Sequence, residues 1–447
     1  MKKLLTHATL SLVFLSLPHT ALAKEWSLNE CIQYALKNNI SLQKNRLTQQ
    51  SAWEDVQQSK SALLPSLTAS TSQNINYNPF QNNGTANGTA GYGQSNVNKF
   101  SYNGTYGVNA NWTLWNGSRN HYQVKLNNNI AQQAEMTTAV TAQSIQEQIT
   151  LLYFQILYAQ EAIVVNKESL ATSIKNEERG KEMYQVGKIS RADLSQLKAQ
   201  RVQDEYNIVA SESSLNDYKR QLKQILEITN NEDFNIVTPP TTSQEALQDI
   251  PAVHAVYMAA IEHRPEMKLA QLAIEGSDIN IKMAKSLNMP TIGLTGTVAT
   301  NTHSLDDNSW GKQIKNNLYS SAGVSLNIPL FDNRNKKTAL NKALIDKENN
   351  QLDLRNKQTV LYANIENYWL QATNNQNKYK AALVNVKSES ESYELLSEQF
   401  RLGLKNIVEL MTGKTRLITA QQNELQSKYL TILHINLLHF YQTGQLK

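Results

Sequence analysis

A motif near the C-terminus, Gly413-Lys414-Thr415, has the residue types that end a phosphate-binding loop. In such a loop another glycine stands five positions before the triplet's own glycine, and this chain has Val408 there. The motif also falls inside a predicted helix over about 406–441, whose backbone N–H groups are used by the helix itself. The sequence therefore does not predict a nucleotide site here.

The remaining residues with metal-binding or nucleophilic chemistry do not form a site. His434 and His439 are five positions apart, which places them on different helix faces, and no HExxH motif occurs. Cys31 is the only cysteine, so no intrachain disulfide can form. Its position away from the predicted mature N-terminus also argues against lipidation, and we read it as a small apolar helix residue. We expect no metal, no cofactor and no catalysis.

The N-terminus predicts export from the cytoplasm. Lys2 and Lys3 precede an apolar core, and Ala21-Leu22-Ala23 offers a small-residue cleavage site, so we predict a signal peptide over 1–23. Cleavage lowers the net charge from +5 to +3, which is too mild to indicate a nucleic-acid partner. No other stretch reaches the roughly 18 apolar residues of a membrane helix, so we expect no helical span.

One stretch alternates strictly between large apolar and small polar side chains. The apolar positions are occupied by Phe100, Tyr102, Tyr106, Val108, Trp112 and Leu114, and the positions between them by serine, threonine, asparagine and glycine. Successive strand side chains point to opposite faces, so this strand has one apolar and one polar face. A half-buried strand of a soluble sheet would have this pattern, and so would a strand between lipid and a watery lumen.

The same order of elements occurs twice along the chain. Gly187 and Gly403 are 216 residues apart, as are Gly107 and Gly323, whereas Pro65 and Pro290 are 225 apart. The difference of nine is absorbed by a polar, glycine- and asparagine-rich loop over 78–98. We predict an internal duplication in which each half contains a helix, two strands and a long helical hairpin.

The predicted boundaries follow from proline, glycine and hydrophobic periodicity. The first repeat covers 24–228, with a helix over 28–61, strands over 64–78 and 99–115, and a hairpin whose tip is 186–190. A linker over 229–250 follows. The second repeat covers 251–447, with a helix over 252–287, strands over 290–300 and 317–330, a loop around 303–310, and a hairpin whose tip is 402–406.

Four strands are too few for a membrane barrel, because open edges are not tolerated in lipid and about eight strands is the minimum. The chain must oligomerise, or its strands must form a soluble sheet. The long helices have narrow apolar stripes, with Leu194, Leu215 and Leu222 at multiples of seven residues, as in coiled coils. We therefore predict a mainly α fold with long hairpins that pack side by side around a watery centre.

The chain resembles the TolC-like outer membrane efflux protein family (outer membrane factors) over nearly all of its mature length. The resemblance rests on motifs around the strands, Leu63-Leu64-Pro65-Ser66-Leu67 and Trp112-Thr113-Leu114-Trp115-Asn116-Gly117, and above all on the two tips. Each tip has an aromatic residue, a glycine three positions later and an acid six positions after the glycine. These residues are Tyr184, Gly187 and Asp193 in the first tip and Phe400, Gly403 and Glu409 in the second.

The resemblance implies a homotrimer with a twelve-stranded barrel in the outer membrane of a Gram-negative-type bacterium and an α-helical tunnel through the periplasm. Such a protein is a passive exit duct for drugs, other small molecules or proteins. It works with a periplasmic adaptor (membrane fusion) protein and an inner-membrane transporter of the RND or ABC type. Outer membrane lipid then surrounds the aromatic face of the strands, and the pore is gated at the periplasmic tips.

The resemblance also implies roles for the tips. The turns dock the adaptor through Val186, Gly187, Lys188, Ile189, Ser190, Leu402, Gly403, Leu404, Lys405 and Asn406. Asp193 and Glu409 ring the closed aperture, with Lys405 where the family often has a basic residue that ties the closed state. The alternative for both acids is a solvated residue that favours a helix start. Phe400 lacks a tyrosine's hydroxyl and Thr412 replaces a second acid, so the closing network departs from the family's.

Two other classes of protein compete with this reading. A secreted coiled-coil or adhesin-type structural protein explains the signal peptide and the helices, but not the alternating strands that recur with them. A general porin would need many more strands and much less helix.

Overall fold

The computed structural model describes residues 25–77, 79, 99–229, 233–238, 243–304 and 306–446, and the chain divides into two compact units. Unit 1 comprises residues 1–40, 144–251 and 368–438, and unit 2 comprises 41–143, 252–367 and 439–447. The predicted signal peptide and all of the predicted 78–98 loop except Pro79 lie outside the described residues.

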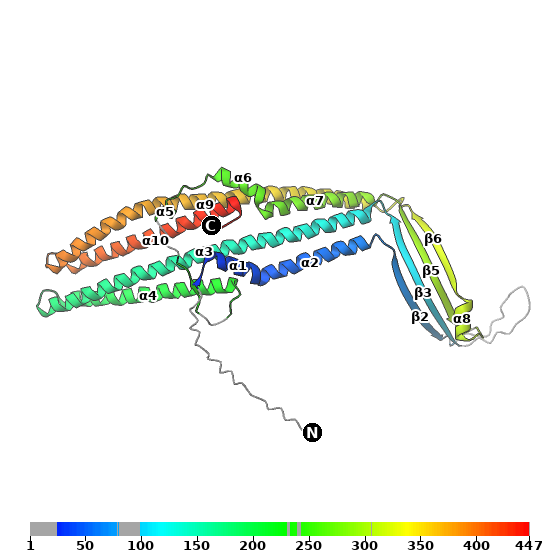
Figure 1. Ribbon diagram of the computed structural model, residues 1–447, viewed down its shortest axis with the longest axis horizontal. Coiled ribbons are helices and arrows are strands. Elements are labelled where there is room, and N and C mark those ends of the chain that lie inside the picture. The colour runs from blue at the N-terminus through cyan, green and yellow to red at the C-terminus, as the bar shows by residue number, and fades with distance from the viewer. Residues whose placement is uncertain are drawn as a thin grey trace, which may run out of the picture. The chain divides into compact units, whose positions relative to one another are not determined.

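Most of the chain is helical, and two helices are unusually long (Figure 1). The helices α3 and α9 have 67 residues each, or about 100 Å at 1.5 Å per residue. The helices are α1 Leu28–Asn38, α2 Ile40–Ser61, α3 Arg119–Gln185, α4 Arg191–Ile225, α5 Ser243–Ala246, α6 Val253–His263, α7 Pro265–Ser286, α8 Trp310–Asn316, α9 Asn335–Arg401 and α10 Ile407–Thr443. The strands are β1 Glu25–Trp26, β2 Ser66–Tyr77, β3 Phe100–Trp115, β4 Asn235–Ile236, β5 Thr291–His303 and β6 Tyr319–Asn327.

Both predicted first helices are broken in the structure, which corrects the sequence analysis. The helix predicted over 28–61 stops at Asn39, whose amide Nδ2 donates to the carbonyl oxygen of Ile225 at 3.0 Å. The helix predicted over 252–287 stops at Arg264, because Pro265 has no N–H to continue α6 and instead begins α7.

Two predicted irregular segments contain regular structure. The predicted linker includes β4, which pairs in parallel with β1, and α5. Trp26 of β1 packs on Phe234, with ring centroids 5.9 Å apart. The helix α8 begins at Trp310, at the end of the predicted loop around 303–310.

One described helix, α3, is long and apolar enough over one window to cross a membrane by length and composition. The sequence analysis expected none. However, 56% of that window is buried inside the protein, as in the core helix of a soluble protein. We therefore read this part of α3 as core.

Unit 2 contains an antiparallel sheet with the strand order β2-β3-β5-β6 (Figure 1). The register aligns the alternation of all four strands. Tyr106 lies opposite Thr71 and Thr300, and Leu294 lies opposite Trp112 and Val324. Residues opposite one another share a face, so the sheet has one polar and one largely apolar face.

The two faces differ clearly in composition. The polar face carries Ser66, Thr68, Ser70, Ser72, Asn103, Thr105, Asn109, Asn111, Thr295, Thr297, Asn301, Ser321 and Ser325. The other face carries Leu67, Ala69, Val108, Ala110, Trp112, Ile292, Leu294, Val298, Ala322, Val324 and Leu326. A bulge between Thr113 and Trp115 sets Trp115 opposite Ile292, so Trp115 joins the apolar face and Leu114 falls outside the ladder.

The helices of unit 2 pack through small side chains. Ala52 and Val56 of α2 form a buried cluster with Ala131 of α3, and Ile281 and Ala284 of α7 form one with Ala343 of α9. Alanine lets helix axes approach closely, which suits parallel alignment over a long distance.

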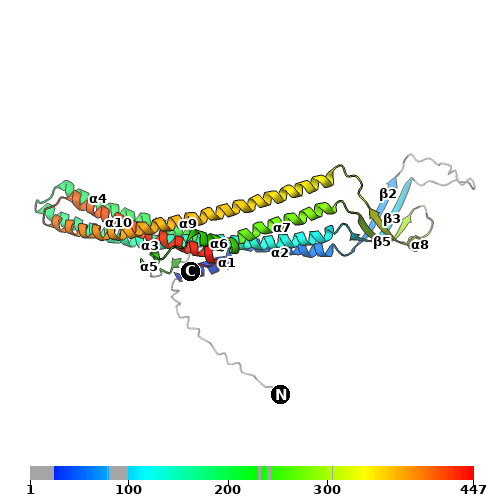
Figure 2. The same ribbon diagram turned by 90° about the horizontal axis from the view of Figure 1, so that it is seen from above.

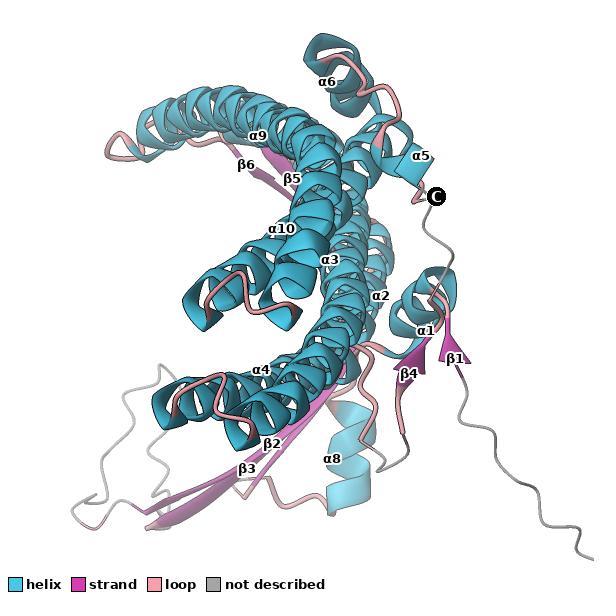
Figure 3. Ribbon diagram, turned by 90° about the vertical axis from the view of Figure 1, so that its left-hand side faces the viewer, coloured by secondary structure: helices cyan, strands magenta, loops and turns pink. Residues whose placement is uncertain are grey.

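Unit 1 contains two helical hairpins, one formed by α3 and α4 and the other by α9 and α10. Figure 3 views both hairpin turns from the tip end. Below the turns, Leu197 of α4 forms a buried cluster with Phe400 of α9 and with Ile407 and Leu410 of α10. The two tips therefore share one small hydrophobic core.

Candidate functional site

The two turns at the hairpin tips have the same backbone conformation. Gly187 has φ +74° and Gly403 has φ +76°, in the left-handed region. In each turn a backbone bond closes the helix end: the N–H of Lys188 donates to Met183 O at 2.8 Å, and that of Leu404 to Gln399 O at 2.9 Å. No atom lies within 4 Å of a Cβ built at either glycine, so glycine is required by φ alone.

The two matched acids cap the helices that follow the turns. The N–H of Ser190 donates to Asp193 Oδ2 at 2.9 Å, and the N–H of Asp193 donates to Ser190 Oγ at 3.1 Å. In the second tip, the N–H of Asn406 donates to Glu409 Oε2 at 3.2 Å, and the N–H of Glu409 donates to Asn406 Oδ1 at 2.9 Å. Each acid is therefore the third residue of its helix and forms the reciprocal pair of hydrogen bonds of a capping box.

The caps differ in their charge partners. Backbone and side-chain hydrogen bonds from Ser190 lower the pKa of Asp193. Lys405 donates to Glu409 Oε1 at 2.6 Å, and this bond, followed by that from the Asn406 backbone, lowers the pKa of Glu409. The structure therefore places Lys405 with the acid of its own tip, and both carboxylates are ionised at neutral pH.

The outer surface of the tips is apolar and exposed. Val186 is 68% exposed and Leu404 is 71% exposed, and Leu402 and Val408 also point into solvent. Apolar side chains clustered on an exposed turn are typical of a surface that binds a partner.

Phe400 lies in the shared tip core rather than at the surface. Its side chain is 2% exposed and packs in the cluster with Leu197, Ile407 and Leu410. A hydroxyl in this setting would need a polar partner, which explains the fit of phenylalanine here. A polar contact from α3 to α9 is instead made by Asn176, whose Nδ2 donates to the hydroxyl of Tyr393 at 3.1 Å.

In each hairpin, a glycine of one helix packs against a leucine of the other helix. A Cβ at Gly180 of α3 would collide with Leu197 of α4, and a Cβ at Gly413 of α10 would collide with Leu396 of α9. Gly180 and Leu396 are 216 residues apart, as are Leu197 and Gly413, so the small and large partners are exchanged between the hairpins. Gly413, which suggests a phosphate loop in the sequence, is a packing residue in the structure.

Lys414 links the two hairpins through a buried ion pair. Its ammonium contacts Asp204 Oδ2 of α4 and Ser173 Oγ of α3, and donates to Ser169 O of α3 at 2.9 Å. Asp204 also accepts from Gln200 Nε2 at 3.0 Å. Lys414 and Asp204 are only 3% and 2% exposed, so the pair is held inside the protein.

Burial lowers the pKa of Lys414, and the contact with Asp204 opposes that shift. The two charges therefore depend on one another: removal of either leaves the other buried without its countercharge. We refer to Lys414, Asp204, Ser173 and Ser169 as the buried brace.

Sequence reasoning missed the buried brace and the Asn176–Tyr393 contact. One signal was present: Asp204 stands seven residues after Leu197, at a coiled-coil core position where a charge needs a partner. Its partner is 210 residues away, so the sequence did not identify it.

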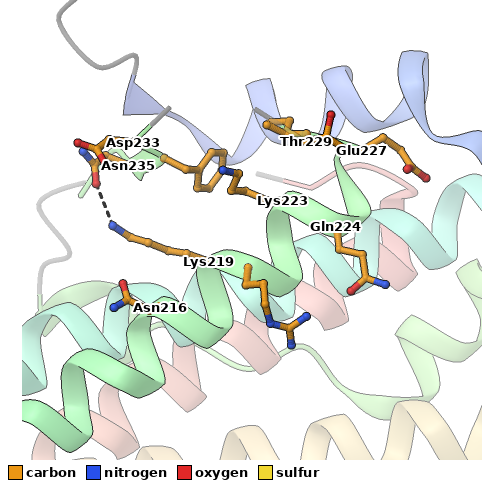
Figure 4. A pocket seen from close by; sticks show the side chains of 11 residues that line it. Asn216, Lys219, Lys223, Gln224, Glu227, Thr229, Asp233 and Asn235 are labelled. Carbon is orange, nitrogen blue, oxygen red and sulfur yellow. Dashed lines mark hydrogen bonds between the residues drawn. The ribbon is translucent and has the colours of Figure 1, made fainter. Parts of the chain in front are cut away.

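A separate groove of about 660 Å³ lies between the end of α4 and the segment around Asp233. Figure 4 shows Lys219 directed at Asn235, to whose Oδ1 its amine donates at 2.8 Å. The Lys219 amine thus already has a hydrogen-bond partner within the protein. Among the described residues no group of three or more His, Cys, Asp or Glu side chains could hold a metal.

A family model of outer membrane efflux proteins (OEP) matches residues 31–227 and 256–436. The chain is 24% identical over 418 residues to the outer membrane protein TolC of Vibrio cholerae serotype O1, covering 92% of this chain and 89% of that protein. It is 21% identical over 423 residues to the outer membrane efflux protein BepC of Brucella suis biovar 1, covering 92% and 84%.

Solved channels share the fold. The Campylobacter jejuni CmeC outer membrane channel superposes with a TM-score of 0.76 at 16% identity, covering 94% of this chain and 86% of that one. The open state of the Neisseria gonorrhoeae MtrE outer membrane channel gives a TM-score of 0.74 at 17% identity, covering 93% and 88%.

The buried brace generates a test by double-mutant cycle. Lys414→Met should destabilise the protein by about 3–5 kcal/mol, because it leaves the Asp204 carboxylate buried and unpaired. The double variant Lys414→Met/Asp204→Leu should recover most or all of that loss, since it removes both charges. Thermal unfolding of the detergent-solubilised protein, followed by circular dichroism, measures both.

Lys198→Met on the exposed face of α4 is the matched control and should change stability by no more than about 0.5 kcal/mol. A Lys414→Met variant as stable as this control would mean that the brace does not hold the hairpins together.

The caps predict that the tips loosen in acid. Both acids have lowered pKa values in the folded state, so their stabilising effect is complete above the unfolded values of about 3.9 and 4.3 and is lost as pH falls through the folded values. Hydrogen exchange at the starts of α4 and α10, corrected for intrinsic rates, should therefore accelerate below about pH 4.

Asp193→Asn should abolish this acid response at the start of α4 only, and Glu409→Gln at the start of α10 only. Each tip thus serves as the control for the other. An acid response that persists in the substituted tip would assign it to other groups.

Proposed function

The chain belongs to the outer membrane efflux protein family, and from this we infer that it is the outer membrane exit duct of a tripartite export system. It is an outer membrane efflux channel of the TolC-like type, and such channels are passive rather than enzymatic. The finer proposal adds a homotrimer, a periplasmic adaptor, an inner-membrane transporter of the RND or ABC type, and a gate at the tips. Its substrates are drugs, other small molecules or proteins.

The observation that carries the trimer is the open sheet. The strands β2 and β6 form its two edges, and all their residues are exposed. In lipid, unpaired backbone groups cost several kcal/mol each, so the edges must pair with other copies. Three copies supply twelve strands and pair every edge. The two stretches matched by the family model support the proposed duplication, with repeats over 24–228 and 251–447 and a linker over 229–250.

The apolar face of the sheet is proposed to contact lipid. Its band from Tyr106 to Trp115 measures about 30 Å along the strand, or about 23 Å in depth at a tilt near 40°. This matches the roughly 25 Å apolar band of outer membrane barrels. Val108, Trp112 and Trp115 then face lipid, and Phe100 and Tyr102 lie on the same face beyond Tyr106. Leu114, which the sequence analysis also assigned to the lipid-facing side, lies in the bulge.

The tips are proposed as both docking surface and gate. The turns 186–190 and 402–406 present the exposed apolar residues to an adaptor. Three copies of Asp193 and Glu409 give a ring of six carboxylates, three of them paired with Lys405, and its remaining negative charge attracts cations and repels anions. Helix capping is compatible with this role, because each carboxylate is ionised and its residue is still partly exposed.

The sheet proposal is tested by charge on its two faces. Ala110→Arg should lower the yield of assembled protein in the outer membrane, since Ala110 lies near the middle of the proposed lipid face, where arginine costs about 2–4 kcal/mol. Asn109→Arg, one residue away on the polar face, should assemble normally. Equal assembly of both variants, measured by heat-resistant oligomer in membrane fractions, would contradict a lipid-facing sheet.

The gate proposal is tested with the acid ring. In planar bilayers, Asp193→Asn/Glu409→Gln should change single-channel conductance and reduce cation preference by about twofold or more, since the ring's negative charge is lost. Glu212→Gln/Asp217→Asn, which removes two acids from α4 away from the turn, is the control. A double tip variant that behaves like this control would place the aperture elsewhere.

A further inference from the structure

The largely apolar face of the sheet changes character at Tyr106. Toward one end it carries Val108, Val298 and Leu294. Toward the other it carries a polar row, Gln73, Gly104 and Thr302, and beyond that row Ile75, Tyr102, Tyr77 and Phe100. The full 16 residues of β3 span about 50 Å, more than a tilted strand needs to cross the apolar band. From this length and from the polar row of Gln73, Gly104 and Thr302, we place the boundary of the hydrocarbon near Tyr106.

The helix α8 lies against this face at the point of change. Thr300 Oγ1 donates to Ile314 O at 2.8 Å, and Trp310 Nε1 donates to the Tyr106 hydroxyl at 3.2 Å. Thr300 and Tyr106 are opposite one another in the register and share the apolar face. Figure 2 shows α8 beside the end of β5.

The contacts fix the orientation of α8. Gln313 is 6% exposed; its Oε1 accepts from the N–H of His303 at 2.8 Å, and its Nε2 donates to Asn308 O at 2.8 Å. Lys312 and Lys315 are exposed and three residues apart, so they are neighbours on the outer side of the helix. Trp310 is 59% exposed at the edge of the apolar band.

The charges around α8 leave a positive excess. Lys99, before β3, adds a third exposed lysine at this end of the sheet. The acids nearby are Asp306 and Asp307, and Asp306 Oδ1 accepts from both the backbone N–H and the Nδ2 of Asn308, at 2.9 and 2.8 Å. Asp306 is thus turned into its own loop.

We propose that α8 binds the phosphorylated headgroups of outer-leaflet lipids, with Lys312 and Lys315 on the phosphates and Trp310 at the boundary of the hydrocarbon. The inference rests on the proposed function, because it requires the apolar face to contact lipid. Tryptophan and lysine side by side at the edge of an apolar band are suited to this interface. Lipid would thereby fix the depth at which the sheet sits.

The test measures retention of bisphosphorylated lipid A by the detergent-solubilised full-length protein, using native mass spectrometry. At about 1 kcal/mol per lysine, Lys312→Gln/Lys315→Gln should weaken retention about thirtyfold. Lys378→Gln/Lys387→Gln, two exposed lysines of α9, is the matched control and should retain lipid A like the wild type. Lipid A without its phosphates should not be retained, and inorganic phosphate should not compete.

Retention by the Lys312→Gln/Lys315→Gln variant equal to that of the control overturns the inference, as does equal retention of the dephosphorylated lipid. Failure of the proposed function looks different, because the wild-type chain would then be missing from outer membrane fractions. If the chain is found in outer membrane fractions but binds lipid A independently of these lysines, only the lipid proposal is contradicted.

Discussion

The hydrogen bonds that two strands leave unmade are the constraint on which this architecture depends. The sheet pairs β3 and β5 on both sides but leaves β2 and β6 with one open edge each. In the proposed channel the sheet lies in lipid, where an open edge is not tolerated, so the proposal requires closure by further copies. Closure around an axis would repeat the two hairpins of each copy around that axis, as the proposed gate also requires.

At the tips, the two acidic side chains have a structural role in addition to the proposed role in transport. Asp193 and Glu409 each complete a helix cap, and Lys405 neutralises only the second acid. Deeper in the hairpins, the buried Lys414–Asp204 pair joins α10 to α4. The partly exposed carboxylates of the tips thus cap helices, whereas the Lys414–Asp204 pair is buried between the hairpins.

Sequence patterns predicted the strands of the sheet in unit 2 and the turns at the tips correctly, but they did not predict contacts between residues that are far apart in the sequence. Alternation around Val108 predicts a strand because the period of two is intrinsic to β structure, and Gly403 predicts a turn that needs positive φ. The break at Asn39 was missed because it depends on a carbonyl of α4, and the one before Pro265 was missed although proline signals it directly. The partner of Lys414 was invisible, since only the packing of α3, α4 and α10 brings Asp204 to it.

In the described part of the chain the buried brace is present once, although the proposed duplication would repeat each hairpin. With the 216-residue offset, the counterpart of Lys414 is the exposed Lys198, and the counterpart of Asp204 is the buried Ala420. The ion pair that connects the two hairpins of one protomer therefore has no equivalent at the positions related by the 216-residue offset. In a ring of six hairpins, the three contacts within protomers would contain the buried brace and the three contacts between protomers would not. Such a ring would be three-fold rather than six-fold in its buried ion pairs.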